Sequence, residues 1–197
     1  MGLINIIYKN INFLLKNLYF IFKFGLKNKD KFFLALKISV IFILHNLKKI
    51  IFFNKYKNEK KIFNFYIKEK NFSHNWFSEN IPVWVSILKS IKEDKINCLE
   101  IGSYEGMSAL FTLKNFTQSQ IDCIETFEGS DEHYKINFSN VEKNFHQNLI
   151  NYKNRYNIYK MTSDNFFLHH VKDKTYDLIY IDGSHHSKQV YKDAYNS

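Results

Sequence analysis

Proline, glycine and cysteine are scarce in this chain of 197 residues, which has one proline, six glycines and two cysteines. So little proline and glycine excludes collagen-like chains and chains that consist mainly of linkers. Cys98 and Cys123 each lie two residues before a glutamate, in apolar stretches that we expect to be buried strands. We interpret both as reduced thiols in a core, not as a disulfide or a zinc pair, and expect a cytoplasmic protein.

Long uncharged apolar runs are also missing. In the helix that we predict from Asp30 to about Phe53, the longest such stretch runs from Ile38 to Leu47, about half of what a bilayer crossing needs. No charge-free segment resembles the core of a signal peptide with a cleavage site. We therefore expect no helix that spans a membrane.

Acidic residues are rare in the first 60 positions, which hold 12 lysines against Asp30 and Glu59. The whole chain has a formal charge of +9, so the excess belongs to this segment and the remainder is close to neutral. The remainder also has no basic stripe of its own. This distribution argues against nucleic acid as a partner.

The first 22 residues have apolar positions at helical spacing, while Lys9, Lys16 and Lys23 repeat every seventh residue on another face. Together with the helix after Asp30, they predict a basic amphipathic helical extension over residues 1–60. Two interpretations stay open. The extension either lies peripherally on the inner, anionic face of a membrane, or packs on the rest of the chain or on a second copy in a homo-oligomer.

Residues 61–197 contain enough apolar sequence for one α/β domain. We interpret the stretch from Lys55 to Lys70, which is charged and aromatic without a clear period, as a connection into this domain. Pro82 suits the first turn of a helix that continues to about Ile91. Trp76 and Trp84 are expected to pack in the core, as large aromatic side chains usually do.

The segment from Asn97 to Gly106, NCLEIGSYEG, is an apolar run that opens into a polar turn with two glycines. This pattern is typical of a buried parallel strand that delivers a loop to a ligand. The spacing G-x-x-x-G differs from the G-x-G-x-x-G of dinucleotide folds, which argues against a nicotinamide or flavin enzyme. The next strand ends at Glu125, where a doubly wound fold commonly has an acid that receives the two hydroxyls of a ribose.

Two further strands are predicted at residues 158–161 and 176–181, with helices at 139–151, 164–171 and from Ser187 on. The expected order of the four strands in the sheet is 3-2-1-4. Between the second and third strands lies a polar insert, whose Glu128, Asp131, Glu132 and His133 either line an acceptor pocket or form a solvated loop. The last strand, in YDLIYIDGSHH, brings Asp182 to the carboxyl edge of the sheet beside the first strand.

These motifs together resemble the class I S-adenosylmethionine-dependent methyltransferases, over about residues 72–197. Within that class the sequence is most similar to small-molecule O-methyltransferases of the catechol and macrolide-sugar kind. The resemblance implies a Rossmann-like, mostly parallel, doubly wound sheet that binds S-adenosylmethionine and methylates a hydroxyl of a small molecule or glycan. It implies these cofactor contacts: Glu100, Gly102, Ser103, Tyr104 and Gly106 at the methionine end, Glu125 at the ribose, and Ser163 with Asp164 at the adenine.

Asp182 and His185 are the candidate catalytic residues. Methyl transfer needs the acceptor oxygen in line with the methyl group and its proton removed, and a neutral imidazole is suited to that proton transfer. The resemblance also implies that Asp182 ligates a divalent cation such as Mg²⁺ in the metal-dependent members. The alternative is that DGSHH is only a turn that ends a strand, which Asp-Gly often forms.

The resemblance implies a fifth strand beyond the position of Ser197 and, in the metal-dependent members, the remaining acidic ligands. We therefore expect an incomplete sheet with the fourth strand at its edge, and cofactor binding that is better retained than turnover. The alternative function is an inactive or fragmentary methyltransferase-like domain that serves as a membrane-surface or scaffold protein.

Overall fold

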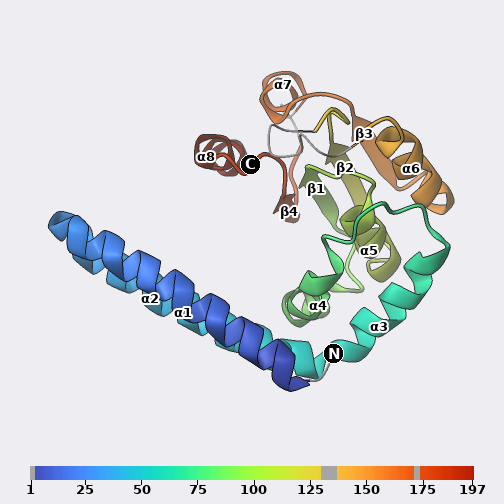
Figure 1. Cartoon of the computed structure of the whole chain (residues 1–197). Coiled ribbons are helices and arrows are strands. Elements are labelled where there is room, and N and C mark those ends of the chain that lie inside the picture. Colours follow the sequence, from blue (N-terminus) through green and yellow to red (C-terminus); the bar gives the residue numbers. More distant parts are fainter. Residues whose placement is uncertain (1–2, 130–136, 171–173) are drawn as a thin grey trace. The chain divides into compact units, whose positions relative to one another are not determined.

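The computed structural model describes residues 3–129, 137–170 and 174–197 (Figure 1). The chain divides into two compact units, Met1–Lys57 and Asn58–Ser197. The sequence had suggested an extension of residues 1–60 and a domain of residues 61–197. Each unit has its own internal packing.

The first unit is a hairpin of two long helices, α1 (Leu3–Lys27) and α2 (Phe32–Lys55), joined by Asn28 and the short 3-10 helix η1 (Lys29–Lys31). Both predicted helices are thus confirmed. The side chain of Asn28 closes the end of α1 by donating a hydrogen bond of 2.9 Å to the carbonyl oxygen of Phe24. Gly25 lets the helices approach closely beside the turn, since a Cβ there would lie 2.9 Å from the Cβ of Ala35.

The stretch between Lys55 and Lys70, which we interpreted from the sequence as a connection into the domain, is helical. This stretch forms the helix α3 (Lys57–Tyr66), followed by the 3-10 helix η2 (Ile67–Glu69). Phe63 of α3 is buried and meets the ring of Phe111 edge-on, with the ring centroids 5.3 Å apart. The ammonium group of Lys114 lies over the ring of Tyr66, 4.0 Å from its centroid. Aromatic contacts therefore fix a helix that a search for aliphatic periodicity overlooks.

The second unit is built on a sheet of four parallel strands in the order β3-β2-β1-β4, which confirms the predicted α/β fold class and strand order (Figure 1). The strands are β1 (Asn97–Ile101), β2 (Gln120–Ile124), β3 (Tyr156–Tyr159) and β4 (Leu178–Ile181). β3 begins two residues earlier than expected. Met161, its predicted end, has already left the ladder and donates its backbone N–H to the carbonyl oxygen of Tyr159.

Helices cover both faces of this sheet, as parallel strands require. The larger core lies under α4 (Ile81–Leu88), α5 (Met107–Asn115) and α6 (Val141–Asn148), and the smaller one under α7 (Ser163–His169). α8 (Ser187–Asn196) contacts α7 and β4.

Cys98 and Cys123 are buried in the larger core as free thiols, as predicted. Burial raises the pKa of Cys98 to about 12, and it raises that of Cys123 as well. Both thiols therefore stay protonated near neutral pH, which suits a packing role.

Within the described residues, β4 pairs with β1 alone and so forms one edge of the sheet. All four of its side chains are half-buried. In the same part of the chain, no helix combines the length and the apolar character that a membrane crossing requires.

Candidate functional site

A cavity of about 890 Å³ opens at the carboxyl ends of β1, β2 and β4. Its walls come from the loops that follow these strands, from the start of α7, from α8 and from the segment that precedes α4. The volume is in the range of small-molecule sites, and this edge of the sheet is where doubly wound folds bind their ligands. The structure thus brings the loops singled out in the sequence to one cavity.

Both glycines in the loop after β1 are required by the packing of the protein itself. Gly102 has a φ of +86°, and a Cβ there would overlap the backbone of Asp182. Gly106 has a φ of +80°, and a Cβ there would lie 3.0 Å from the ring of Phe145. The first glycine therefore lets β1 meet β4 closely, and the second lets the start of α5 pack on α6.

Tyr104, between these glycines, also has a positive φ, 48°, which is uncommon for a residue with a side chain. Its backbone N–H donates to Oε2 of Glu125 at 2.7 Å, which holds the residue in this conformation. Oε1 of the same carboxylate accepts the backbone N–H of Phe127 at 2.9 Å, and Phe127 has a φ of 61°. Glu125 therefore ties the loop after β1 to the loop after β2.

Glu125 lines the cavity and is only partly buried. Each oxygen of its carboxylate accepts one backbone N–H and has a further lone pair, so the group is able to accept two more hydrogen bonds from a ligand. This is the arrangement that two neighbouring hydroxyls of a ribose require. Contact of Glu125 with a ribose stays a prediction.

Glu100 lies beneath the loop and outside the lining of the cavity, 1% exposed. Its Oε2 accepts a hydrogen bond of 2.8 Å from Oγ of Ser103. Burial raises the pKa of Glu100 to about 7, against the effect of its hydrogen bonds. Gly106 is likewise absent from the lining, so contacts of these two residues with a cofactor stay predictions, whereas Ser103 and Tyr104 do face the cavity.

Ser163 and Asp164 begin α7, where Thr162 caps the helix by accepting the backbone N–H of Asn165 at 3.3 Å. Both line the cavity. Their side chains also bind α8, since Oγ of Ser163 donates to Asp193 at 2.6 Å and Asp164 accepts from Nζ of Lys192 at 2.8 Å. The hydrogen bond from Lys192 lowers the pKa of Asp164.

Asp182 and His185 follow β4 and line the same cavity. The hydroxyl of Tyr180 donates to Oδ2 of Asp182 at 2.8 Å, and Nε2 of His185 lies 3.7 Å from Oδ1. Burial, together with the negative charge of Asp182, raises the pKa of Tyr180 and keeps its hydroxyl a donor. The carboxylate is thus fixed on one side by a tyrosine and faces an accessible imidazole on the other.

A cation site at Asp182 receives no support. Among the residues that the structure describes, no three His, Cys, Asp or Glu side chains are grouped so that they would hold a metal ion. Ligation by Asp182 therefore stays a prediction from the resemblance.

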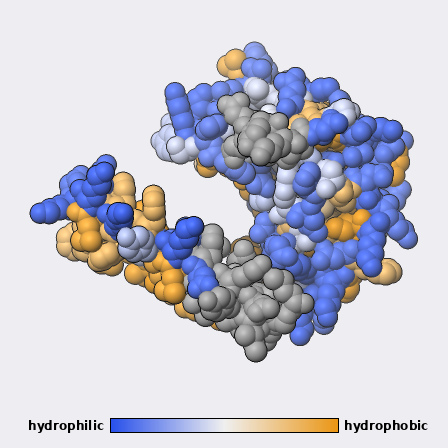
Figure 2. All heavy atoms as spheres, in the orientation of Figure 1, coloured by the Kyte–Doolittle hydropathy of each residue, from blue (hydrophilic) through white to orange (hydrophobic). Residues whose placement is uncertain are grey.

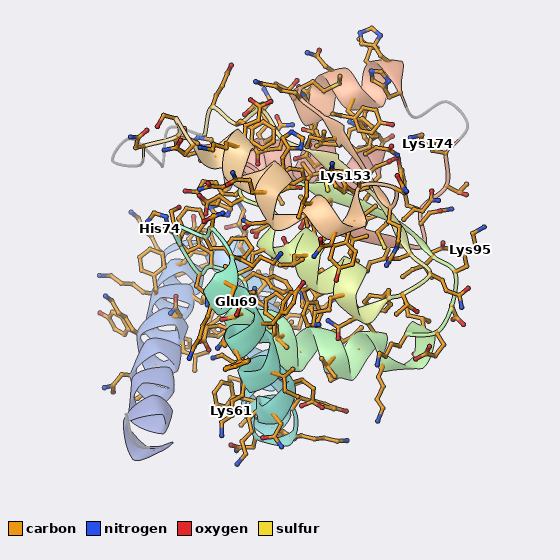
Figure 3. The ribbon with its side chains drawn as sticks, turned by 90° about the vertical axis from the view of Figure 1, so that its right-hand side faces the viewer. Lys61, Glu69, His74, Lys95, Lys153 and Lys174 are labelled. Atoms are coloured by element: carbon orange, nitrogen blue, oxygen red, sulfur yellow. The ribbon has the colours of Figure 1, made fainter. Side chains whose placement is uncertain are left out.

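The segment before α4 supplies a wall of the cavity that the sequence did not predict (Figure 3, around His74). The rings of His74 and Trp76 stack with centroids 4.8 Å apart, and Trp76 lies 4.7 Å from the ring of Tyr104. Placing Trp76 in the core is wrong, because it is 48% exposed. Trp84 is packed as expected, edge-on to Tyr180. The polar neighbours of Trp76, in NFSHNW, were the available signal for a surface aromatic.

The polar insert between β2 and β3 contributes little to the described walls of the cavity. Glu128 is exposed and does not line the cavity, in agreement with a solvated loop. Asp131, Glu132 and His133 lie outside the described residues, as does the predicted end of the helix at Val171. The insert therefore adds no acidic side chain to the described walls.

Residues 99–196 match the model of a family that is described as a methyltransferase domain. The match takes in just under half of the chain. It begins in β1, ends in α8 and contains the loops that form most of the cavity. No curated protein matches the chain. The parallel sheet in the order β3-β2-β1-β4 and the cavity at its carboxyl edge agree with the similarity of this segment to a methyltransferase domain.

Proposed function

We propose that the cavity binds S-adenosylmethionine and that the domain transfers the methyl group to a hydroxyl of a small molecule or glycan. One observation carries the proposal: the carboxylate of Glu125 lines the cavity while it holds the backbone of Tyr104. The same carboxylate can thereby accept hydroxyls of a ligand and hold the glycine loop of the neighbouring strand.

The residues of the cavity fit a nucleoside with an amino-acid tail. Glu125 would accept the hydroxyls of the ribose, and Ser103 with Tyr104 would face the methionine end. The adenine would lie against the start of α7, near Ser163 and Asp164. Bound S-adenosylmethionine supplies an electrophilic methyl group on its sulfonium.

The chain's own contribution to the reaction would be alignment and proton removal. His185 is the base that we propose for the acceptor hydroxyl, because its imidazole is accessible in the cavity and a carboxylate oxygen of Asp182 lies 3.7 Å away. Asp182, held in turn by Tyr180, would orient the imidazole and face the positive charge that it gains with the proton of the acceptor. No step is assigned to a cation, because no three His, Cys, Asp or Glu side chains of the described residues are grouped so that they would hold one.

Isothermal titration calorimetry of the full chain with S-adenosylmethionine and S-adenosylhomocysteine tests the proposal. Both should bind, and Glu125→Ala should weaken them by at least tenfold, since about 1.5–3 kcal/mol is lost with a hydrogen bond to a charged group. Glu142→Ala, which removes an exposed carboxylate outside the cavity, is the matched control and should not change the affinity. If the chain is folded, as cooperative unfolding would show, and still binds neither compound, the proposal is refuted.

A further inference from the structure

We propose that the hairpin of α1 and α2 docks on an anionic membrane surface, independently of the function of the second unit. The described part of the hairpin exposes many large apolar side chains, which are the orange spheres beside the blue hydrophilic ones (Figure 2). Large apolar side chains of α2 are between 46% and 82% exposed: Phe33, Leu34, Leu36, Ile38, Val40, Ile41, Leu44, Leu47 and Ile51. Monomeric proteins in water seldom expose a continuous apolar surface of this length.

The geometry of α2 shows which side of the helix carries these residues. Ala35 is buried where the helices meet, against Gly25 of α1. At about 3.6 residues per turn, most of the exposed apolar positions lie on the opposite half of the helix, whereas Ile38 lies on the half of Ala35. Lys37 interrupts that half near its start. By the same spacing Lys48 falls on this half as well, so the outward side of α2 is mostly apolar between Phe33 and Ile51, over about five turns.

The outward side of α1 is different, because it is basic. Lys16, Lys23 and Lys27 are separated by seven and four residues, so they lie on one face of the helix and all three are exposed. Exposed apolar side chains flank this row: Leu15, Tyr19, Phe20, Phe22, Phe24 and Leu26. The turn adds the exposed Lys29 and Lys31. Long lysine stems let the ammonium groups reach lipid phosphates while aromatic rings enter the interface.

The charge of the hairpin identifies the occupant of this surface. Met1–Lys57 contains eleven lysines and one acidic residue, Asp30. A second copy would bring one strongly basic surface against another, and the repulsion opposes such a pairing. An anionic lipid surface offers negative charge to the lysines and an apolar phase to the exposed apolar side chains. The described helices do not meet the requirements of a membrane span, so the contact would be peripheral.

Co-sedimentation of the full chain with vesicles tests this inference. The vesicles are phosphatidylcholine alone and phosphatidylcholine mixed with phosphatidylglycerol, at low and high NaCl. The chain should bind the mixed vesicles, bind them less at high salt, and bind phosphatidylcholine weakly. The variant Lys23→Gln/Lys27→Gln/Lys31→Gln should lower the partition coefficient on the order of 100-fold, since each lysine near the surface strengthens binding by about fivefold.

A matched variant, Lys89→Gln/Lys92→Gln/Lys95→Gln, removes the same charge from exposed positions of the second unit and should bind like the wild type. For the apolar surface, Leu36→Gln/Val40→Gln/Leu47→Gln should lower binding at least tenfold. Its control is Ile87→Gln/Ile150→Gln/Leu168→Gln, at exposed positions outside the hairpin, which should leave binding unchanged.

Three results would overturn the inference: no sedimentation with anionic vesicles, equal loss in the hairpin variants and their controls, or sedimentation that ignores both lipid charge and salt. A dimer in solution that the apolar variant dissociates, without vesicle binding by the wild type, would assign the surface to a second copy instead. Circular dichroism of each variant confirms that the helices are intact.

Discussion

Gly102, at the end of β1, packs so closely on Asp182, at the end of β4, that a Cβ on the glycine would overlap the aspartate's backbone. The backbone N–H of Asp182 donates to the carbonyl oxygen of Ile101 at 2.8 Å and continues the ladder between the two strands. The loop that we assign to the cofactor and the residues that we assign to catalysis are therefore positioned by the same contact.

Gly102→Ala should destabilise the second unit by about 2 kcal/mol or more, because the residue has a positive φ and no room for a methyl group. Gly183→Ala is the matched control. Its Cβ would lie 3.3 Å from the side chain of Ile101, and no positive φ strains it, so the loss should be smaller. Urea unfolding followed by circular dichroism measures both. Equal losses of stability would contradict a steric requirement for glycine at position 102.

Glu100→Gln should make stability less dependent on pH. Burial raises the pKa of Glu100 to about 7, whereas a glutamate in the unfolded chain titrates near 4.5. The folded state thus binds the proton more tightly, and the wild type loses stability as the pH rises from the unfolded to the folded pKa. Glutamine has the shape of the protonated acid and does not ionise, so the variant escapes this loss.

Unfolding free energies at pH 5, 6, 7 and 8 measure the effect. The difference between Glu100→Gln and the wild type should shift in favour of the variant by about 2–3 kcal/mol from pH 5 to pH 8. The hydrogen bond from Ser103 can be kept by the amide oxygen of glutamine, so the variant should fold. A difference that stays constant over this range would contradict the buried, proton-binding state of Glu100.

Phe63→Ala should cost about 3–5 kcal/mol of stability, as is usual when a buried phenylalanine is truncated. Phe65 offers a control on the same helix, because it is 74% exposed and Phe65→Ala should change stability by less than about 0.5 kcal/mol. The comparison tests whether α3 belongs to the core of the second unit. Similar small effects of both changes would assign α3 no part in that core.

The difference between α3 and the sheet shows that local patterns can be predicted from the sequence, whereas contacts between distant residues cannot. The strands with Cys98 and Cys123 are apolar runs that end in a glycine or an acid, and that local pattern was enough to predict the strands, whereas their order in the sheet followed from the resemblance to a doubly wound fold. α3 is anchored by the rings of Phe63 and Tyr66 on residues far along the chain, and no local period marks such contacts. The polar neighbours of Trp76 mark a surface position, but its contact with Tyr104 could not be predicted, because Tyr104 lies in a loop whose backbone is held by Glu125.

Asp182→Asn and His185→Gln should separate catalysis from cofactor binding. If His185 removes the proton of the acceptor, its replacement should lower turnover about 10²–10⁴-fold, the usual contribution of a general base. Asp182→Asn should lower turnover as well, because an amide holds the imidazole without stabilising its charge. The affinity for S-adenosylmethionine should change little in either variant. Formation of S-adenosylhomocysteine with catechols and sugars as acceptors measures the turnover.

His169→Gln is the control for these two changes. His169 is an exposed histidine at the end of α7 that does not line the cavity, so turnover should equal that of the wild type. Unchanged turnover of His185→Gln would exclude the imidazole as the base and leave alignment as the main contribution of the domain. Loss of turnover together with loss of cofactor affinity would instead show that the turn after β4 shapes the cofactor site. The Asp182 backbone, which packs on Gly102, provides the physical route for that outcome.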